Sequence, residues 1–417
     1  LGSMGHFTAE AIAPDIQPVV NSDELVDINW PLEEIASDQF QIAGGWGGGT
    51  FVGSVGVTLN NLSIKNFFKK GAWRPYPMGQ NQRLSISAQT NGTYYKAFAI
   101  SFTDPWMGGR KPNSFTISAH YSDENNTYYA WQKGTRYFRT AGVAAGLGKR
   151  LDWPDPYFTF YAEASYERYM LKDWNTFVLK NGAANLLSIR LVLGRNSVDQ
   201  PIYPRRGSDF SVSVQLTPPY SLWDGKDYKS TALSEQERYN WIEFHKWMLK
   251  GQWFTPLTRN GNLVLMARAE MGYLGHYNKN KVSPFERFEV GGDGMTGYNM
   301  YGIDIISMRG YDDGALDPVG SNYSCAYNKY TMELRYPLLL KGQTNIYVLG
   351  FLEGGNGFTS WKEFSPFKIK RSAGIGVRLF LPVVGMVGVD WGWGFDPAAG
   401  QTKRSGSHIH FTMGMQF

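Results

Sequence analysis

The last ten residues of the chain alternate between two kinds of side chain without interruption. Apolar residues occupy every odd position from Ile409 to Phe417, whereas polar or small residues occupy the even positions from His408 to Gln416. A repeat of two residues is the pattern of a β-strand whose two faces meet different surroundings. This segment is therefore predicted to be a strand with one continuous apolar face.

Segments of the same kind recur from about residue 39 to the end of the chain. Many reach the roughly 9–11 residues that a tilted transmembrane strand needs, and single-chain bacterial barrels have an even number of strands. We therefore predict an all-β fold, a 16-stranded antiparallel transmembrane β-barrel. The sixteen segments are 40–46, 51–59, 84–90, 95–102, 115–121, 137–147, 158–169, 187–195, 210–216, 242–257, 263–274, 330–338, 345–352, 372–381, 386–395 and 408–417.

Composition removes several other classes of protein. Charged residues make up 18% of the chain, against about 25% in ordinary soluble domains. One cysteine excludes an internal disulfide framework and a multi-cysteine metal site. The net charge of +5 includes no basic cluster interleaved with aromatic residues, so a nucleic-acid partner is not predicted. No segment approaches the roughly 18 consecutive apolar residues of a membrane helix.

A soluble β-sandwich is the competing architecture, and the placement of aromatic residues favours the barrel. Tyrosine and tryptophan cluster near the ends of the predicted strands, where an interfacial belt would need them. The connections at one end are mostly short, but 60–82 and 196–207 are longer than a barrel predicts. The belt residues are Trp46, Tyr94, Tyr95, Trp106, Trp153, Tyr169, Trp253, Tyr336, Trp391 and Trp393.

One connection, about 275–328 between the eleventh and twelfth strands, is too long and too apolar for a surface turn. We expect it to fold into the lumen. Arg309, Gly310 and Tyr311 lie near its middle, and the next two strands each contain a lone carboxylate, Glu333 and Glu353. A guanidinium group can bind two carboxylates at once, so we predict that Arg309 pins this loop inside the barrel.

No arrangement of residues indicates catalysis. The six histidines lack metalloprotease spacing, and Cys325 has no histidine partner nearby. His408 and His410 share the inward face of the last strand, where ordinary lumenal residues are a better interpretation than metal ligands. We therefore predict that the protein is not an enzyme and has no metal or cofactor.

Several segments resemble the BamA family of outer-membrane protein assembly factors, within the outer-membrane insertase and translocase superfamily. Residues 308–311 match the family's Val-Arg-Gly-Phe/Tyr signature with Met for Val, and 288–292 match its aromatic-x-x-Gly-Gly segment. Residues 374–382, 388–392 and 414–417 are also similar. Glu353 stands where the family usually has Asp, and the insertion 294–306 is longer than the family minimum.

The resemblance implies a protein that folds and inserts β-barrel proteins into the bacterial outer membrane. Its partners would be unfolded barrel clients, outer-membrane lipids and accessory assembly lipoproteins, and both termini would be periplasmic. A lateral gate would lie between the first and last strands. The gate residues would be Phe40, Ile42, Gly44, Gly45, Ile409, Phe411, Met413, Gly414 and Phe417.

Other functions remain open. A protein-secretion translocator of the same superfamily, two-partner or TamA-like, is the main alternative, and a diffusion porin is less favoured. A two-partner translocator would carry an N-terminal plug helix, of which residues 1–36 show no trace.

Two domains are predicted. Residues 38–417 form the barrel. Residues 1–37 would combine a tag remnant, typical of Gly2-Ser3-Met4, with the tail of a truncated periplasmic POTRA domain. The strand-like piece 25–30 in this region has no partner that the sequence reveals.

Overall fold

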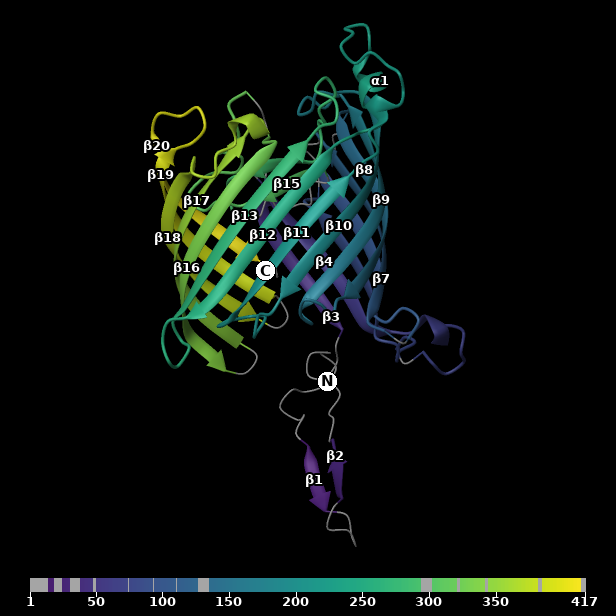
Figure 1. Ribbon diagram of the computed structural model, residues 1–417, viewed down its shortest axis with the longest axis vertical. Coiled ribbons are helices and arrows are strands. Elements are labelled where there is room, and N and C mark those ends of the chain that lie inside the picture. Colours follow the sequence, from purple (N-terminus) through teal and green to yellow (C-terminus); the bar gives the residue numbers. More distant parts are fainter. Residues whose placement is uncertain are drawn as a thin grey trace.

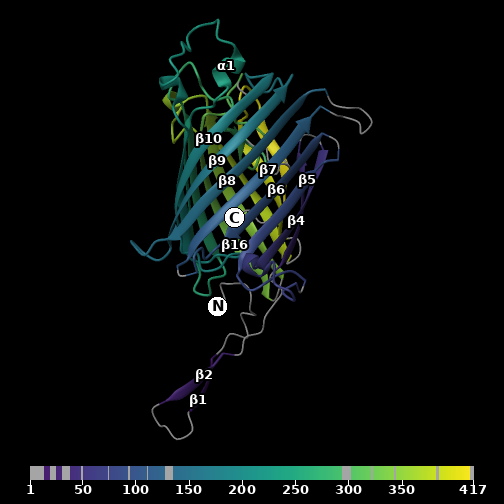
Figure 2. The ribbon, with the colours of Figure 1, turned by 90° about the vertical axis from the view of Figure 1, so that its right-hand side faces the viewer.

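Sixteen strands form one antiparallel sheet that curves around a central space (Figures 1 and 2). This confirms the predicted sixteen-stranded barrel. The computed structural model describes residues 14–18, 25–30, 38–47, 50–73, 75–92, 94–109, 111–126, 135–293, 302–320, 323–341, 344–381 and 385–413.

Each predicted segment coincides with one strand, and most strands extend a few residues further than predicted. The tenth begins three residues later than expected, at His245. The barrel strands are β3 (Gln39–Gly47), β4 (Thr50–Leu62), β5 (Gln82–Thr90), β6 (Tyr95–Asp104), β7 (Asn113–Asn125), β8 (Tyr137–Arg150), β9 (Phe158–Lys172), β10 (Gly182–Asn196), β11 (Gly207–Leu216), β12 (His245–Pro256), β13 (Val264–Gly275), β16 (Ala326–Lys341), β17 (Thr344–Phe358), β18 (Lys370–Leu381), β19 (Gly385–Pro397) and β20 (Arg404–Met413).

The remaining elements lie in connections. Helix α1 (Glu235–Tyr239) begins with a capping box between Ser234 and Glu237, as the sequence there indicates. Among the described residues, no helix is long and apolar enough to cross a membrane. The other elements are β14 (Arg287–Val290) and β15 (Ile303–Ile306), paired in parallel, and the single-turn helices η3 (Ile64–Asn66), η4 (Tyr220–Leu222) and η5 (Trp361–Glu363).

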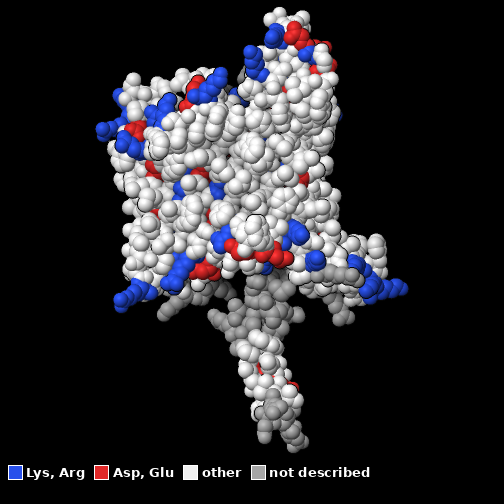
Figure 3. All heavy atoms as spheres, viewed as in Figure 1, with Lys and Arg blue, Asp and Glu red and all other residues white. Residues whose placement is uncertain are grey.

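The barrel wall is apolar outside and polar inside. On β19, Val389 and Trp391 are 42% and 45% exposed, whereas Asp390 between them is fully buried. Outward residues of neighbouring strands continue this surface, because Trp391 pairs with Ile375 of β18 and with Ile409 of β20. Figure 3 shows charged side chains gathered mainly at the two ends of the wall. Apolar side chains on the outside and charged side chains on the inside are the distribution expected of a barrel that is surrounded by lipid.

Two aromatic residues assigned to the interfacial belt lie elsewhere. Tyr95 and Tyr169 are 1% and 0% exposed. The prediction was wrong for Tyr169 because side chains alternate along β9, so Tyr169 shares the inward face with Glu167. The outward positions of Trp153 and Trp253 agree with the prediction.

The amino-terminal region also differs from expectation. The strand-like piece is β2 (Val26–Asn29), and it pairs antiparallel with β1 (Asp15–Pro18). This partner could not be predicted, because β1 is only four residues long and ends in proline. The predicted POTRA origin of the hairpin stays a prediction, and the predicted tag residues lie outside the described part of the chain.

Candidate functional site inside the barrel

The connection between β13 and β16 folds back into the barrel, as the sequence predicts. Phe285, Phe288 and Met308 of this loop are each at most 1% exposed. They belong to one buried cluster that also contains Tyr169 of β9 and Tyr327 of β16. Side chains of the loop therefore fill part of the lumen.

Arg309 lies at the inner tip of the loop and contacts both carboxylates named from the sequence. Its Nη2 atom donates to Glu333 Oε1 at 2.7 Å and to Glu353 Oε1 at 2.7 Å. Its backbone N–H donates to the other oxygen of Glu353 at 2.9 Å. The guanidinium group also lies over the Phe351 ring, 3.7 Å from the ring centre. The guanidinium group therefore has two carboxylates and an aromatic ring as partners, and a buried cation needs such compensation.

The arginine belongs to a larger set of charges on the barrel wall. Glu333 binds Arg335 at 2.7 Å. Asp390 of β19 lies 3.7 Å from Arg309 Nη1 and binds Arg378 at 2.7 Å. The three carboxylates thus face three arginines, and Lys329 Nζ lies a further 4.0 Å from Glu353 Oε1, so each carboxylate has a cation beside it. Asp390 was not among the predicted site residues, although it is a lone acid in an apolar strand like Glu333 and Glu353.

Gly310 brings the loop backbone against the last two strands. Its φ of +86° favours glycine. A Cβ atom on Gly392 of β19 would lie 2.8 Å from the Gly310 nitrogen, so the strand must also be side-chain-free there. The Gly310 N–H donates to Nε2 of His410 on β20 at 2.8 Å. The loop tip therefore touches the strand that carries one edge of the sheet.

Tyr311 fixes the residue after this glycine. Its ring is fully buried, and its hydroxyl donates to the Arg371 carbonyl at 2.8 Å. Burial raises the pKa of the Tyr311 phenol to about 12, so the hydroxyl stays protonated and keeps donating. Glu333 and Glu353 on the wall, with Arg309, Gly310 and Tyr311 on the loop, thus form one contact region.

The inward histidines have polar partners of different kinds. His410 accepts from Gly310, and His408 Nδ1 lies 3.2 Å from Asp312 Oδ1. Among the described residues, no group of three metal-ligating side chains is present. His408 and His410 are lumenal polar residues that contact the loop, and this contact could not be predicted from the sequence.

A second buried cluster, which the sequence analysis missed, holds the base of the loop. Lys246 of β12 is 4% exposed and lies 2.6 Å from Asp304 and 3.2 Å from Glu286. Glu286 also accepts from the Tyr169 hydroxyl at 2.9 Å. Lys246 shares the inward face of β12 with Lys250 and was the available signal, but its partners are 40 and 58 residues away in the chain. We call Lys246, Glu286 and Asp304 the lysine clamp.

Breaking the lysine clamp should loosen the base of the loop. In Lys246→Met the Glu286 carboxylate loses its cation inside the barrel and the partly exposed Asp304 loses an ion pair, at a cost below the about 3–5 kcal/mol of a fully buried pair. We expect faster amide hydrogen exchange in β14 and β15, measured on the folded barrel. Lys250→Met is the matched control, because Lys250 lies on the same face of β12, is half-exposed and reaches Glu270 only at 3.9 Å. Equal exchange in both variants would contradict a role for the clamp.

The predicted gate residues occupy the two ends of the sheet. Gly44 of β3 pairs with Gly53 of β4, so two glycines meet and no cross-strand side-chain contact supports the pair. Cα atoms of β3 and β20 approach within 8 Å, but within 39–47 and 404–413 no backbone pairing joins the two strands. The β3 residues of the predicted gate are Phe40, Ile42, Gly44 and Gly45.

On the other side of this seam, Ile409 and Phe411 are 64% and 58% exposed. Both lie on the outer face of β20, whereas His410 between them is 5% exposed. Met413 is the last residue of β20. Gly414 and Phe417, also predicted for the gate, lie outside the described residues.

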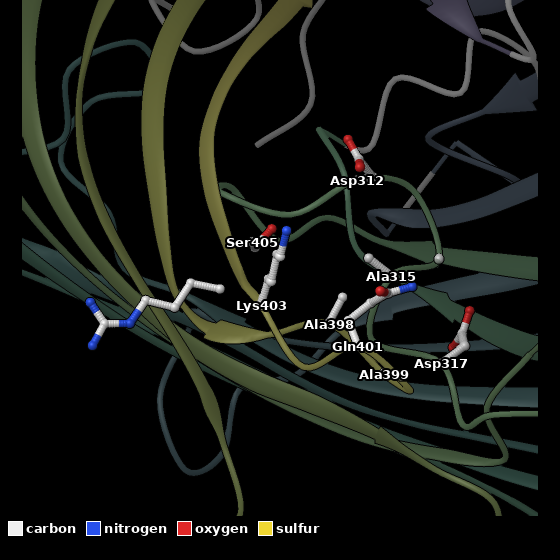
Figure 4. A pocket seen from close by; sticks show the side chains of 10 residues that line it. Asp312, Ala315, Asp317, Ala398, Ala399, Gln401, Lys403 and Ser405 are labelled. Carbon is white, nitrogen blue, oxygen red and sulfur yellow. The ribbon is translucent and has the colours of Figure 1, made fainter.

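A polar hollow of about 380 Å³ separates the loop from the β19–β20 connection. Figure 4 shows Asp312 and Ala315 of the loop across from Lys403 and Ser405. At its side the Ala399 N–H donates to the Ala315 carbonyl at 2.9 Å. The loop is therefore tied to the final hairpin at two levels, here and at Gly310.

Comparison with known proteins identifies the family. Residues 78–417 match the model of the Omp85 superfamily domain, which is most of the chain and includes the loop, its carboxylate partners and β20, whereas β3 lies before the matched residues. The chain belongs to the Omp85 superfamily. This confirms the resemblance at the level of the superfamily, and members of the superfamily are β-barrels of the outer membrane.

Individual relatives of the Omp85 superfamily are distant. The outer membrane protein assembly factor BamA of Neisseria meningitidis serogroup B is 23% identical over an alignment of 354 residues, which covers 80% of this chain. The chain spans 36% of the length of that protein.

Solved structures share the fold. BamA from Haemophilus ducreyi lacking POTRA domains 1–3 has a TM-score of 0.61 and 17% identity, covering 98% of this chain and 75% of that one. CdiB from Escherichia coli has a TM-score of 0.58 and 12% identity, covering 98% and 68%. At identities of 17% and 12%, these likenesses show the fold alone.

Proposed function

We propose that this Omp85 barrel folds and inserts other β-barrel proteins into the bacterial outer membrane through a lateral gate between β3 and β20. The observation that carries the proposal is the seam, where two strands lie side by side without backbone pairing within 39–47 and 404–413. A chain that needs strand pairing could find it there by adding a strand to an exposed sheet edge.

The physical reason lies in the membrane. An unpaired backbone group in the hydrocarbon region costs several kcal/mol, so an incoming strand gains by pairing with the edge of β3 or β20. Glycines in β3 weaken the strand and reduce the cost of opening. The outward Ile409 and Phe411 keep the edge strand compatible with lipid while it moves.

The loop would control the seam. Arg309 fixes the loop tip to β16 and β17, and Gly310 binds His410 on the mobile edge strand. We propose that these contacts stabilise β20 in its closed position. In this proposal, residues 309–311 hold the loop inside the barrel and also hold β20 in its closed position.

A protein-secretion translocator is the second candidate, supported by the fold shared with CdiB. A translocator needs a lumen that a chain can traverse. Here Phe285, Phe288 and Tyr311 are fully buried within the barrel, together with the Arg309 ion pairs. A lumen that the pinned loop partly fills favours the insertase, and it also disfavours a diffusion porin.

The remaining parts of the proposal follow from the insertase function. The partners would be unfolded barrel clients, outer-membrane lipids and accessory assembly lipoproteins, and the protein would catalyse no covalent reaction. The even number of strands puts the start of β3 and the end of β20 at the same end of the barrel, proposed as periplasmic. Residues 1–37 would link the barrel to periplasmic POTRA domains.

Reconstitution would separate the two functions. The chain, joined to its native periplasmic region, is placed in liposomes and given either an unfolded barrel client or a secretion passenger. We expect the client to become folded and protease-resistant in the membrane, while the passenger does not enter the vesicle lumen. Passage of the passenger without client folding would reject the insertase in favour of the translocator.

A further inference from the structure

The long connection between β4 and β5 takes no part in the site described above. It contains η3 and is held by its own hydrogen bonds. The Phe67 N–H donates to the Ile64 carbonyl at 3.1 Å, and Lys69 N–H to the Asn66 carbonyl at 3.0 Å. The Ser63 N–H donates to the Pro77 carbonyl at 2.8 Å and closes the base. The connection is therefore a built element rather than a loose turn.

Its aromatic residues point away from the protein. Phe67, Phe68 and Trp73 are 44%, 94% and 53% exposed. Their rings contact one another, with centres 5.3 Å apart for the two phenylalanines and 5.0 Å apart for Phe67 and Trp73. The indole N–H of Trp73 donates to the Phe67 carbonyl at 3.0 Å. A preformed apolar cluster open to its surroundings marks an interaction surface.

The charges around this cluster have one sign. Residues 61–80 contain three lysines and one arginine, and no Asp or Glu. Lys65, Lys69 and Lys70 are exposed beside the rings. Aromatic rings flanked by lysines are typical of surfaces that lie in the headgroup region of a membrane. Cationic side chains near an anionic leaflet are attracted to it, and this attraction is screened by salt.

The position of the connection points to the same partner. It reaches outward from the lower end of the barrel in Figure 1, and blue side chains mark its outer part in Figure 3. Its base is tied to the residue that precedes β3, because Asp38 accepts from the Tyr76 hydroxyl at 2.6 Å, and the same Asp38 oxygen accepts from the N–H of Asn60 in β4 at 3.0 Å. The connections that follow β6 and β8 add exposed Trp106 and Trp153 at the same end.

We propose that residues 63–81 form an aromatic foot that lies in the headgroup region of an anionic phospholipid leaflet at this end of the barrel. The foot continues the lipid-facing wall into the interface, with rings toward the acyl chains and lysines toward the phosphates. The proposal does not depend on the insertase function, since any barrel with this element would hold lipid there.

The test measures where the foot lies in a membrane. Phe68→Cys in a Cys325→Ala background is labelled with an environment-sensitive fluorophore, and the barrel is reconstituted in vesicles containing spin-labelled phospholipid. Phe367→Cys is the matched control, because Phe367 is 89% exposed in the β17–β18 connection at the opposite end. We expect blue-shifted, strongly quenched emission at position 68 and water-like emission at position 367.

The lipid composition of the vesicles tests whether the lysines of the foot are attracted to anionic headgroups. Vesicles of phosphatidylcholine alone are compared with vesicles that also contain phosphatidylglycerol. We expect deeper burial of the label with phosphatidylglycerol, and loss of that difference in Lys65→Glu/Lys69→Glu/Lys70→Glu and at high salt.

Two results would overturn the proposal. Water-like emission at position 68 in both kinds of vesicle would exclude lipid and direct the search to a protein partner. Equal burial in both, unaffected by the charge reversals, would exclude the anionic leaflet. Client insertion is measured separately, so failure of the foot and failure of the insertase are distinguishable.

Discussion

Replacing Arg309 with alanine should release the loop tip and abolish most client insertion. The substitution leaves Glu333 and Glu353 buried without their shared cation, and breaking a buried pair costs about 3–5 kcal/mol. At about 1.4 kcal/mol per tenfold, the balance between pinned and released loop shifts by roughly 100-fold or more. Folding of a barrel client in proteoliposomes measures the effect, and single-channel conductance should rise as the tip leaves the lumen.

Two further variants make this result interpretable. Arg309→Lys keeps the charge but loses the planar fork that binds two carboxylates, so we expect intermediate activity. Arg371→Ala is the matched control, because Arg371 pairs with Asp396 at a 65% exposed position where an ion pair contributes little. Full client insertion by a folded Arg309→Ala barrel would show that the pinned loop is not needed.

Joining β3 to β20 should stop insertion while leaving the barrel folded. A panel of cysteine pairs, with one member at Phe40 or Ile42 and the other at Ile409 or Phe411, is built in a Cys325→Ala background. A disulfide forms where the Cα atoms come within about 4.4–6.8 Å. The oxidised pair closes the edge at which an incoming strand would add, so we expect complete loss of client folding that returns on reduction.

The control shares one of these cysteines. Val389 and Phe411 are register partners on β19 and β20, both outward, so Val389→Cys with Phe411→Cys joins strands that are already paired. This pair should leave activity unchanged whether oxidised or reduced. Undiminished insertion by a barrel locked across the seam would refute the lateral gate.

The strands were accessible from sequence because membrane and lumen impose opposite requirements on alternate residues. Every predicted strand was found, since the period-two pattern is a local property of each segment. The same logic, applied to Tyr169, would have moved it from the interfacial belt to the lumen, because it lies two residues from Glu167. Whether a residue lies at an odd or an even position along a strand therefore predicts its surroundings better than its distance from the strand end does.

The residues of the candidate site likewise include some that the sequence predicts and others that only the fold brings together. Glu333 and Glu353 were visible as lone acids in apolar strands, and Arg309 as the one cation suited to both. Asp390 carried an equal signal that was not used. Lys246 showed only that it faces inward, and its partners Glu286 and Asp304 become neighbours solely because the loop turns back into the lumen.

By itself, the sequence determined the number of barrel strands, the inward and outward faces of those strands, and a long loop with an arginine suited to bind two carboxylates. The tertiary structure decided which strands the loop touches, that Gly310 meets His410 on the last strand, and that β3 and β20 meet without backbone pairing in their described residues. Those features depend on the curvature of the sheet, which brings β3 and β20 from opposite ends of the chain side by side. Local patterns set the surroundings of each side chain, but only the curved sheet, with the loop folded inside it, sets its partners.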